Sequence, residues 1–259
     1  MPLFRRYIGI DYSGAAAPVT SLKGLRIYVA SPRQEAVEVP PPPSPRKYWT
    51  RRGIAAWLVE RFKEPVPTLA GIDHSFSFPL PYFEAYQLSL DWSDFLDDFQ
   101  RHWPTDEDRT YVNFVREGVC GKGAARTGSA RWRRLAEERA GAKSVFHFDV
   151  PGSVAKSTHA GLPWLRYLRR RVGDRVHFWP FDGWDIPPQR SVLAEIYPSL
   201  CRGDFERRDR TADQHDAYAA AEWMRRADRH GTLSGFFNPP LDLAQRALGL
   251  VEGWILGVQ

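Results

Sequence analysis

The chain has 259 residues and a formal net charge of +5, with 43% hydrophobic and 26% charged residues. This balance is that of a folded globular protein, and it permits a polyanionic partner without demanding one. The two cysteines, Cys120 and Cys201, form no CxxC or Cys/His ligand set, which argues against a disulfide framework and a structural zinc site. No stretch approaches the ~20 apolar residues of a membrane helix, and no signal-like apolar run begins the chain. We therefore expect a cytoplasmic protein with no membrane partner.

Apolar runs in the first third of the chain predict three strands, a helix and a fourth strand. The predicted strands cover residues 7–11, 25–30, 36–39 and 69–72. Short turn signals between them favour an antiparallel meander for the first three. Thr50 is expected to cap a helix over residues 50–62, after a proline-rich connector at residues 40–45. The first and fourth strands each end at an aspartate, so Asp11 and Asp73 lie adjacent if these strands are parallel neighbours.

Residues 82–150 are interpreted as a helical, basic insertion or lid over the sheet. Helices are predicted at residues 90–101 and 131–139, with a glycine-rich basic stretch at residues 118–128 between them. Residues 144–148 predict a short strand. Because linker signals around this block are weak, we treat it as part of one domain rather than as an independent unit.

The last hundred residues predict two long helices separated by two strands. Ser157 is expected to cap a helix that runs from about residue 159 to residue 172. The two strands are predicted at residues 176–179 and 192–198, the second with Glu195 among apolar neighbours. A final long helix is predicted over residues 211–224, rich in alanine and therefore able to lie close to the sheet.

Five carboxylates stand at strand ends or at the start of this final helix. They are Asp11, Asp73, Glu195, Asp213 and Asp216. Residues three apart share a helix face, so Asp213 and Asp216 point together. Acids that converge raise one another's pKa unless cations neutralise them, and hard divalent ions prefer oxygen ligands. The alternative assigns each acid separately, as a turn cap, a loop cap, a core acid paired with arginine, and two first-turn helix acids favoured by the macrodipole.

Arginine supplies most of the positive charge and gathers within residues 116–139 and 166–175. Such clusters either bind a phosphate backbone beside the acidic site or form a solvated charged face. Lys156, Arg126 and Arg131 are weaker candidates for substrate binding.

Two histidines, His74 and His215, neighbour acids in the sequence and are candidates to assist them. His215 stands two positions from Asp213, about 200° around a helix, and is therefore expected to face elsewhere.

Four short motifs occur in the order seen in a ribonuclease H-like family, which is catalogued as a domain of unknown function and described as a predicted nuclease. The motifs are Gly9-Ile10-Asp11, Gly71-Ile72-Asp73, Glu195-Ile196-Tyr197-Pro198 and Asp213-Gln214-His215-Asp216-Ala217. The chain resembles this family over most of its length, including the closing stretch at residues 252–255. The resemblance implies an α/β fold in which a mixed five-stranded sheet carries helices on both faces, within a single domain spanning residues 1–259.

The resemblance also implies an acidic site that binds Mg²⁺ or Mn²⁺. In this comparison Asp11 is the central ligand, and Asp216 or Asp213 is the ligand from the last helix, with Asp73 and Glu195 as further acids of the site. Two departures stand out. Ribonuclease H-like enzymes commonly place a glutamate where this chain has Asp73, and Glu195 is an acid whose role the superfamily pattern does not fix.

The sequence therefore predicts a hydrolase, a metal-dependent nuclease that acts on nucleic acid. Two other functions stay open. One is a phosphotransferase or ATPase of the actin-like branch, for which residues 11–14 provide an aspartate and a nearby glycine but the chain shows no duplicated nucleotide lobe. The other is a non-catalytic nucleic-acid-binding protein of the same fold. Metal-stimulated cleavage favours the first function, nucleotide turnover the second, and binding alone the third.

Overall fold

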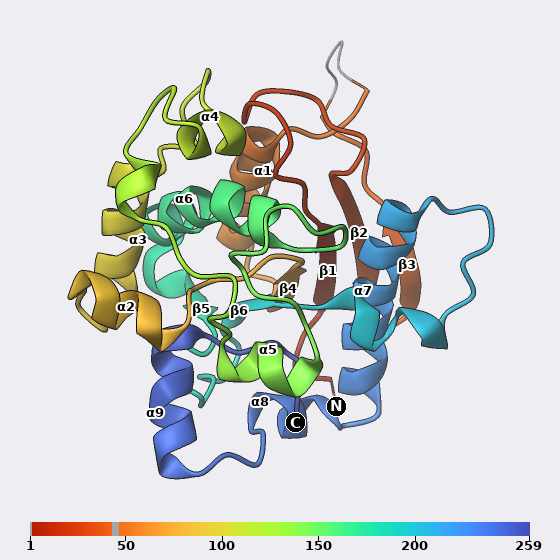
Figure 1. Cartoon of the computed structure of the whole chain (residues 1–259). Helices are drawn as coiled ribbons and strands as arrows, with labels where there is room; N and C mark the ends of the chain where they lie inside the picture. Colours follow the sequence, from red (N-terminus) through yellow and green to blue (C-terminus); the bar gives the residue numbers. More distant parts are fainter. Residues whose placement is uncertain (1, 43–46) are drawn as a thin grey trace.

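A mixed β-sheet forms the centre of the computed structural model, which describes residues 2–42 and 47–259 (Figure 1). The strands of this described part are β1 (Arg6–Asp11), β2 (Arg26–Ser31), β3 (Gln34–Glu38), β4 (Thr68–Ile72), β5 (Val176–Phe178) and β6 (Ser191–Glu195). They are ordered β3-β2-β1-β4-β6-β5. Part of the predicted proline-rich connector, at residues 43–46, lies outside the described residues.

The sheet combines an antiparallel half with a parallel half. β1, β2 and β3 are antiparallel neighbours, as the meander prediction required, whereas β1, β4, β6 and β5 run parallel. The register sets Ile10 beside Ile72, and the Asp73 N–H donates to the Ile10 carbonyl over 2.9 Å. The prediction that Asp11 and Asp73 end neighbouring parallel strands is therefore confirmed.

The expected number of five strands is wrong for the described residues, because the short strand β5 pairs with β6 and extends the sheet to six. The α/β class itself is confirmed. The run at residues 144–148 forms turns instead of a strand. Its apolar side chains, Val145 and Phe146, are buried in the core, while no strand among residues 2–42 and 47–259 pairs with it to accept its backbone hydrogen bonds.

Helices cover both faces of the sheet. In the described residues they are α1 (Arg51–Lys63), α2 (Leu80–Tyr86), α3 (Trp92–His102), α4 (Val112–Arg116), α5 (Leu135–Ala140), α6 (Ala155–Val172), α7 (Ala212–Arg229), α8 (Leu233–Phe237) and α9 (Leu243–Glu252). Thr50 and Thr211 cap α1 and α7 as predicted, each accepting a backbone N–H three residues on. Helix α6 begins two residues before its predicted cap Ser157, whose hydroxyl instead donates to the Val154 carbonyl.

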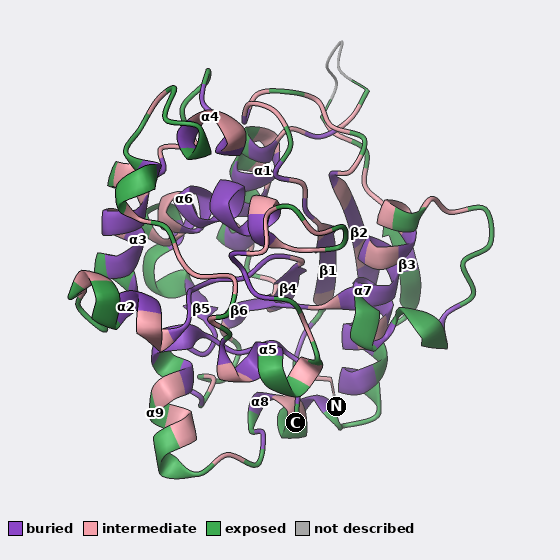
Figure 2. Ribbon diagram, viewed as in Figure 1, coloured by how far each residue is buried: buried purple, intermediate pink, exposed green. Residues whose placement is uncertain are grey.

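Alternating side chains of β1 enter two separate cores, and Figure 2 shows the central strands buried between the helices. Ile8 and Ile10 pack with residues of α1 and α6, and Tyr7 packs with residues of α7. The 82–150 block contributes aromatic side chains such as Tyr82 and Phe95 to the same core as α1 and α6. These helices thus share one core with the sheet. No helix of the described chain is both long and apolar enough to cross a membrane.

Helix α7 approaches β1 so closely that a side chain at Gly9 has no room. A Cβ placed on Gly9 lies 2.2 Å from the Ala217 carbonyl oxygen and 2.7 Å from the Ala221 nitrogen, both backbone atoms. Backbone cannot rotate away as a flexible side chain can, so a larger residue must displace the helix. The alanine-rich face of α7 and the glycine in β1 together set the distance between helix and sheet.

We predict that Gly9→Ala lowers the free energy of unfolding by about 2 kcal/mol or more, because overpacking against backbone strains the helix–sheet contact. Gly235→Ala is the matched control, since a Cβ there meets nothing within 4 Å and its helical position favours alanine. Urea unfolding of both variants checks this. Equal stability of Gly9→Ala and the parent contradicts the prediction.

Candidate functional site

The four predicted aspartates meet at one edge of the sheet. Asp11 is the last residue of β1, and Asp73 directly follows β4. Asp213 and Asp216 lie in the first turns of α7, whose amino end the Thr211 cap fixes. The carboxylates are close enough to repel, since Asp73, Asp213 and Asp216 all raise the pKa of Asp11. The structure therefore brings together acids that are more than two hundred residues apart.

Burial and mutual repulsion change the protonation of these acids. Burial is the largest cause that raises the pKa of Asp11 well above its ordinary value, followed by repulsion from the other three aspartates, and a hydrogen bond from the Tyr12 backbone opposes it. Burial, then Asp216 and Glu195, raise the pKa of Asp73 to about 8. At pH 7 without a bound cation, a proton is therefore held at the Asp11–Asp73 pair.

Arg202 supplies positive charge at the edge of this cluster. It begins a 3₁₀ turn (Arg202–Asp204) and places its Nη1 atom 3.2 Å from an Asp216 carboxylate oxygen. The same guanidinium lowers the pKa of Asp73. The Arg202 side chain is half exposed, so water weakens this ion pair and it neutralises the cluster only in part.

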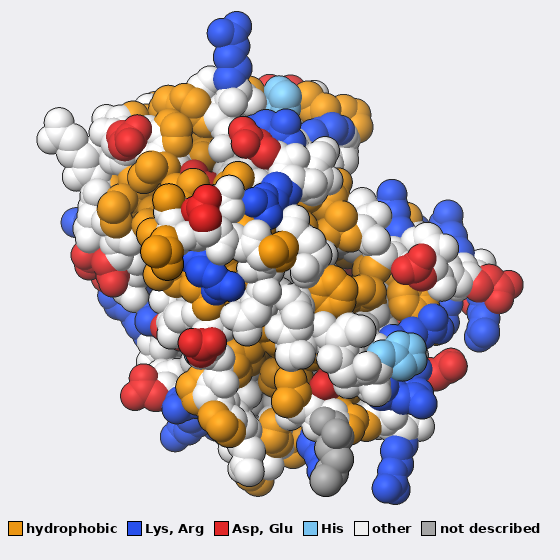
Figure 3. Space-filling model, turned by 90° about the horizontal axis from the view of Figure 1, so that it is seen from below, with side chains coloured by type: hydrophobic (Ala, Val, Ile, Leu, Met, Phe, Trp, Pro, Cys, Tyr) orange, Lys and Arg blue, Asp and Glu red, His pale blue; other side chains and the backbone are white. Residues whose placement is uncertain are grey.

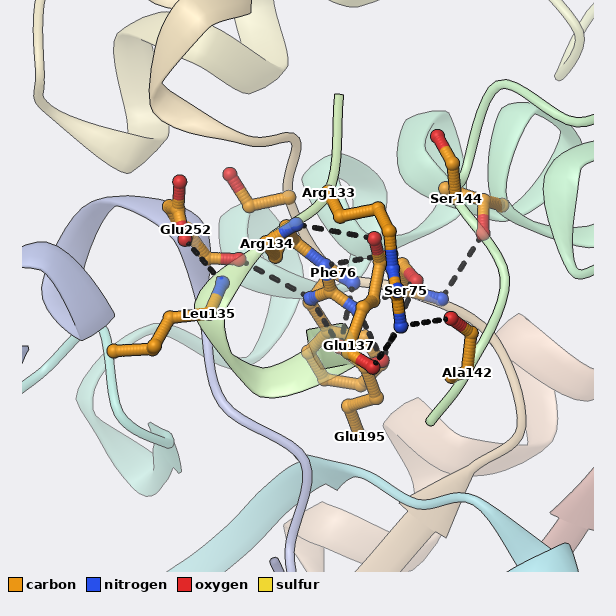
Figure 4. A network of polar contacts seen from close by, with 12 residues as sticks. Ser75, Phe76, Arg133, Arg134, Leu135, Glu137, Ala142, Ser144, Glu195 and Glu252 are labelled. Carbon is orange, nitrogen blue, oxygen red and sulfur yellow. Dashed lines mark hydrogen bonds and ion pairs between the residues drawn. The ribbon is translucent and has the colours of Figure 1, made fainter. Parts of the chain in front are cut away.

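Glu195, the fifth predicted acid, has a different environment. Its side chain is buried, and its two carboxylate oxygens accept hydrogen bonds of 2.6 and 2.8 Å from the Arg134 guanidinium (Figure 4). The Ser75 hydroxyl and the Phe76 N–H donate to it as well. Glu195 therefore corresponds to the alternative of a core acid paired with arginine, and its charge is already compensated.

Arg134 lies beside the candidate site, and the sequence alone did not distinguish it as the partner of Glu195. It is fully buried, and besides Glu195 it donates to Glu137, to the Ser75 hydroxyl and to the Glu252 carbonyl. Burial acts to lower the pKa of Arg134, but the two glutamates outweigh burial and raise it. The predicted helix at 131–139 begins only at Leu135, because Arg134 has an extended backbone. Only its spacing of three residues to Glu137 distinguishes it in a stretch of arginines.

A second buried arginine holds the loop that follows Asp11. Arg51, at the start of α1, is 1% exposed and donates to the carbonyls of Ser13, Ala15 and Ala16 over 2.7–3.0 Å. These bonds fix the turn behind the strand-terminal acid. Lys156 reaches the same loop through its backbone, because a Cβ on Gly14 lies 2.0 Å from the Lys156 carbonyl oxygen.

Both histidine candidates are buried and held by backbone carbonyls. The His74 Nδ1–H donates to the Ser75 carbonyl over 2.9 Å, and burial lowers the pKa of His74 to about 4, so the ring is neutral at pH 7. The His215 Nε2–H donates to the Arg202 carbonyl over 3.1 Å. His215 thus positions the turn that carries Arg202.

The arginine clusters do not form one patch beside the acids. Arg170, Arg171 and Arg175 line a groove of about 800 Å³ together with residues 65–67 and 190, which precede β4 and β6. Because α6 has 18 residues, its carboxyl end lies roughly 27 Å from its amino end at Gly14. The expectation that the 166–175 cluster flanks the acidic site is therefore wrong.

In the other cluster, several arginines are bound within the protein. Arg126 forms an ion pair with Asp98, and Arg116 pairs with Asp149, whereas Arg131 is exposed. Figure 3, which views the molecule from below, likewise shows lysine and arginine side chains scattered among hydrophobic ones. The phosphate-binding role suggested for these arginines stays a prediction.

The donor set fits a hard divalent cation in its chemistry, since all four aspartates offer oxygen. The side chains, however, are not arranged as a metal site. Among residues 2–42 and 47–259, no three His, Cys, Asp or Glu side chains form a group that could hold a metal ion. The aspartates thus lie near enough to shift one another's pKa, but no three of them are arranged as ligands of one ion in the described part of the chain. Binding an ion requires that their side chains turn toward it.

Comparisons with known proteins gave no match: no family model, no curated protein and no solved structure matches the chain. The function of this chain is therefore inferred from the geometry and electrostatics of its own residues.

We predict that Arg134→Met lowers the free energy of unfolding by about 3–5 kcal/mol, because it leaves the Glu195 carboxylate buried without its partner. The double variant Arg134→Met with Glu195→Gln should recover part of the loss. Arg131→Met is the matched control on an exposed arginine and should change stability by less than about 0.5 kcal/mol. Guanidinium unfolding measures all three; a small loss in Arg134→Met would show that the ion pair is dispensable.

A further prediction concerns pH. The pKa of Asp73 is about 8 in the folded protein and near its ordinary value of 3.8 in the unfolded chain. Between these values the unfolded chain releases the proton while the folded protein retains it, so stability falls as pH rises from about 4 to about 8. Asp73→Asn removes this titrating group. Between pH 4 and pH 8, the unfolding free energy of this variant should therefore decrease by about 1–3 kcal/mol less than that of the parent.

Urea unfolding in EDTA at pH 4.5, 6, 7 and 8.5 tests the Asp73 effect. Asp209→Asn, which changes an exposed acid just before α7, is the control and should keep the parental pH dependence. Identical pH dependence in Asp73→Asn and the parent would rule out a proton held at this carboxyl group.

Proposed function

We propose that this protein is a ribonuclease H-like nuclease that depends on a divalent cation and hydrolyses phosphodiester bonds at its aspartate cluster. The observation that carries the proposal is the mutual repulsion of carboxylates around Asp11 and Asp73, whose pKa values are raised by burial and by the neighbouring acids. The order β3-β2-β1-β4-β6, antiparallel and then parallel, with helices on both faces, supports the ribonuclease H-like assignment.

In this proposal Asp11 is the central ligand of Mg²⁺ or Mn²⁺, joined by Asp73 from β4 and by Asp216 or Asp213 from α7. A divalent cation held by these residues would supply the activation of water and the stabilisation of charge on the leaving oxygen. The chain's own contribution is position: two acids stand at ends of hydrogen-bonded strands, and two stand at the capped start of a helix. Arg134 keeps Glu195 in the adjacent core, from which Glu195 still contributes to the raised pKa of Asp73.

The oxygen donors of the four aspartates favour Mg²⁺ or Mn²⁺ over softer ions such as zinc. Cys201 lies next to the cluster, and burial, then Asp204, Asp216 and Asp73, raise the pKa of its thiol to about 12. Without a bound cation the thiol therefore stays protonated at pH 7. Cys120 and Cys201 are both free, which suits the cytoplasmic location that we infer.

We predict that Asp11→Asn abolishes metal-dependent cleavage and the rise in melting temperature that Mn²⁺ gives the parent, because the amide lacks the charge that the cation needs. Without metal, its stability should equal or exceed that of the parent, since one repelling charge is removed. Asp216→Asn should behave likewise, and Asp209→Asn serves as the control.

Melting temperature with Mn²⁺ or EDTA, and cleavage of single-stranded, duplex and branched DNA and RNA, measure these effects. ATP turnover is assayed in parallel, because it is the signature of the phosphotransferase alternative. The proposal is overturned if Mn²⁺ leaves the melting temperature unchanged and the Asp11→Asn variant still cleaves nucleic acid. The aspartates would then be structural caps.

A further inference from the structure

An apolar pocket of about 180 Å³ opens beside the acidic site and has no part in the proposed chemistry. Its walls come from the stretch after β6, from α7, from α8 and from the end of the chain. The residues that line the pocket include Tyr197, Pro198, Leu200, Trp223, Phe236 and Leu256. Four segments that are distant in sequence thus converge on one concave apolar surface.

The pocket presents aromatic rings that solvent reaches. Tyr197, Trp223 and Phe236 are each only half buried, and Leu200 at the rim is 44% exposed. The Trp223 and Phe236 rings are 5.1 Å apart and inclined at 53°, which leaves them as two walls rather than one closed stack. Gly257 also lines the pocket, and a Cβ there would come within 3.1 Å of the Trp223 ring.

This pocket adjoins the acidic site through shared residues. Tyr197 and Ile196 line both the apolar pocket and a small cavity of about 20 Å³, which Asp73 and Glu195 also line. A cavity of that size has room for one water molecule. On α7, the pocket residue Ala220 comes one helical turn after Asp216. A group seated in the pocket therefore has its neighbouring atoms close to the aspartates.

We propose that this pocket takes one nucleobase of a single-stranded nucleic acid, stacked against Trp223 and Phe236, with the attached backbone directed toward the aspartates. The inference rests on the proposed function for the identity of the ligand. The volume is below the 300–1,000 Å³ typical of sites for whole ligands, so it suits a single ring system. Stacking on aromatic side chains accepts any base, because every base has a π-face.

The test compares two fluorescently labelled DNA 10-mers, one of thymidines and one entirely abasic, by anisotropy in EDTA. The two carry the same phosphate charge, so a difference in affinity reports the bases alone. We expect the parent to bind the abasic strand about tenfold more weakly, and Trp223→Leu to remove most of this difference. Trp57→Leu is the matched control: Trp57 is also half buried on a helix and paired with another ring, but on α1.

Melting temperatures verify that the variants fold, and Phe236→Leu replaces Trp223→Leu if that protein does not. Equal binding of the two strands by the parent, no binding of either, or an unchanged difference in the folded pocket variant overturns the proposal. Binding measured in EDTA, and binding measured with the Asp11→Asn variant, test the pocket independently of metal-dependent cleavage. Base-dependent binding that persists in Asp11→Asn supports the pocket even if cleavage is absent, and cleavage without base dependence refutes the pocket alone.

Discussion

The buried ion pair between Arg134 and Glu195 is the interaction on which the surrounding structure depends. Two opposite charges are removed from water here, and such a pair is tolerable only when hydrogen bonds satisfy nearly every donor and acceptor. The Arg134 guanidinium meets this condition with Glu195, Glu137, the Ser75 hydroxyl and the Glu252 carbonyl. Glu252 in turn accepts the N–H groups of Leu80 and Leu135. The ends of β4, β6 and α9 and the start of α5 are thereby joined.

One edge of the sheet thus carries two kinds of acid. Glu195 is buried and compensated by a fully buried guanidinium, whereas Asp11 and Asp73 are half-buried and face other carboxylates, with the half-exposed Arg202 beside them. A protein rarely keeps uncompensated acids together without a ligand that uses them. This difference between Glu195 and the two aspartates, at the same edge of the sheet, is the physical reason to place the candidate site at the aspartates.

Local patterns in the sequence predicted the parts of this structure that local chemistry determines. The sequence predicted the apolar runs that end at Asp11 and Asp73 and the threonine caps of α1 and α7. Each of these signals lies within a few residues of the chain. The partner of Glu195 is 61 residues away and resembles every other arginine in its stretch. Likewise, the run at 144–148 has strand composition but pairs with none of the described strands, which only the tertiary structure reveals.

The contact between Gly9 and α7 has a consequence for how variants of this protein would be interpreted. The helix carries Asp213 and Asp216 at one end and rests directly on the β1 backbone through Ala217 and Ala221. A bulky substitution on that alanine face would shift the whole helix and move both carboxylates away from Asp11. In a mutational scan scored by the proposed activity, these alanines would rank beside the acids although they are buried between helix and sheet. A parallel measurement of protein abundance would separate the two groups.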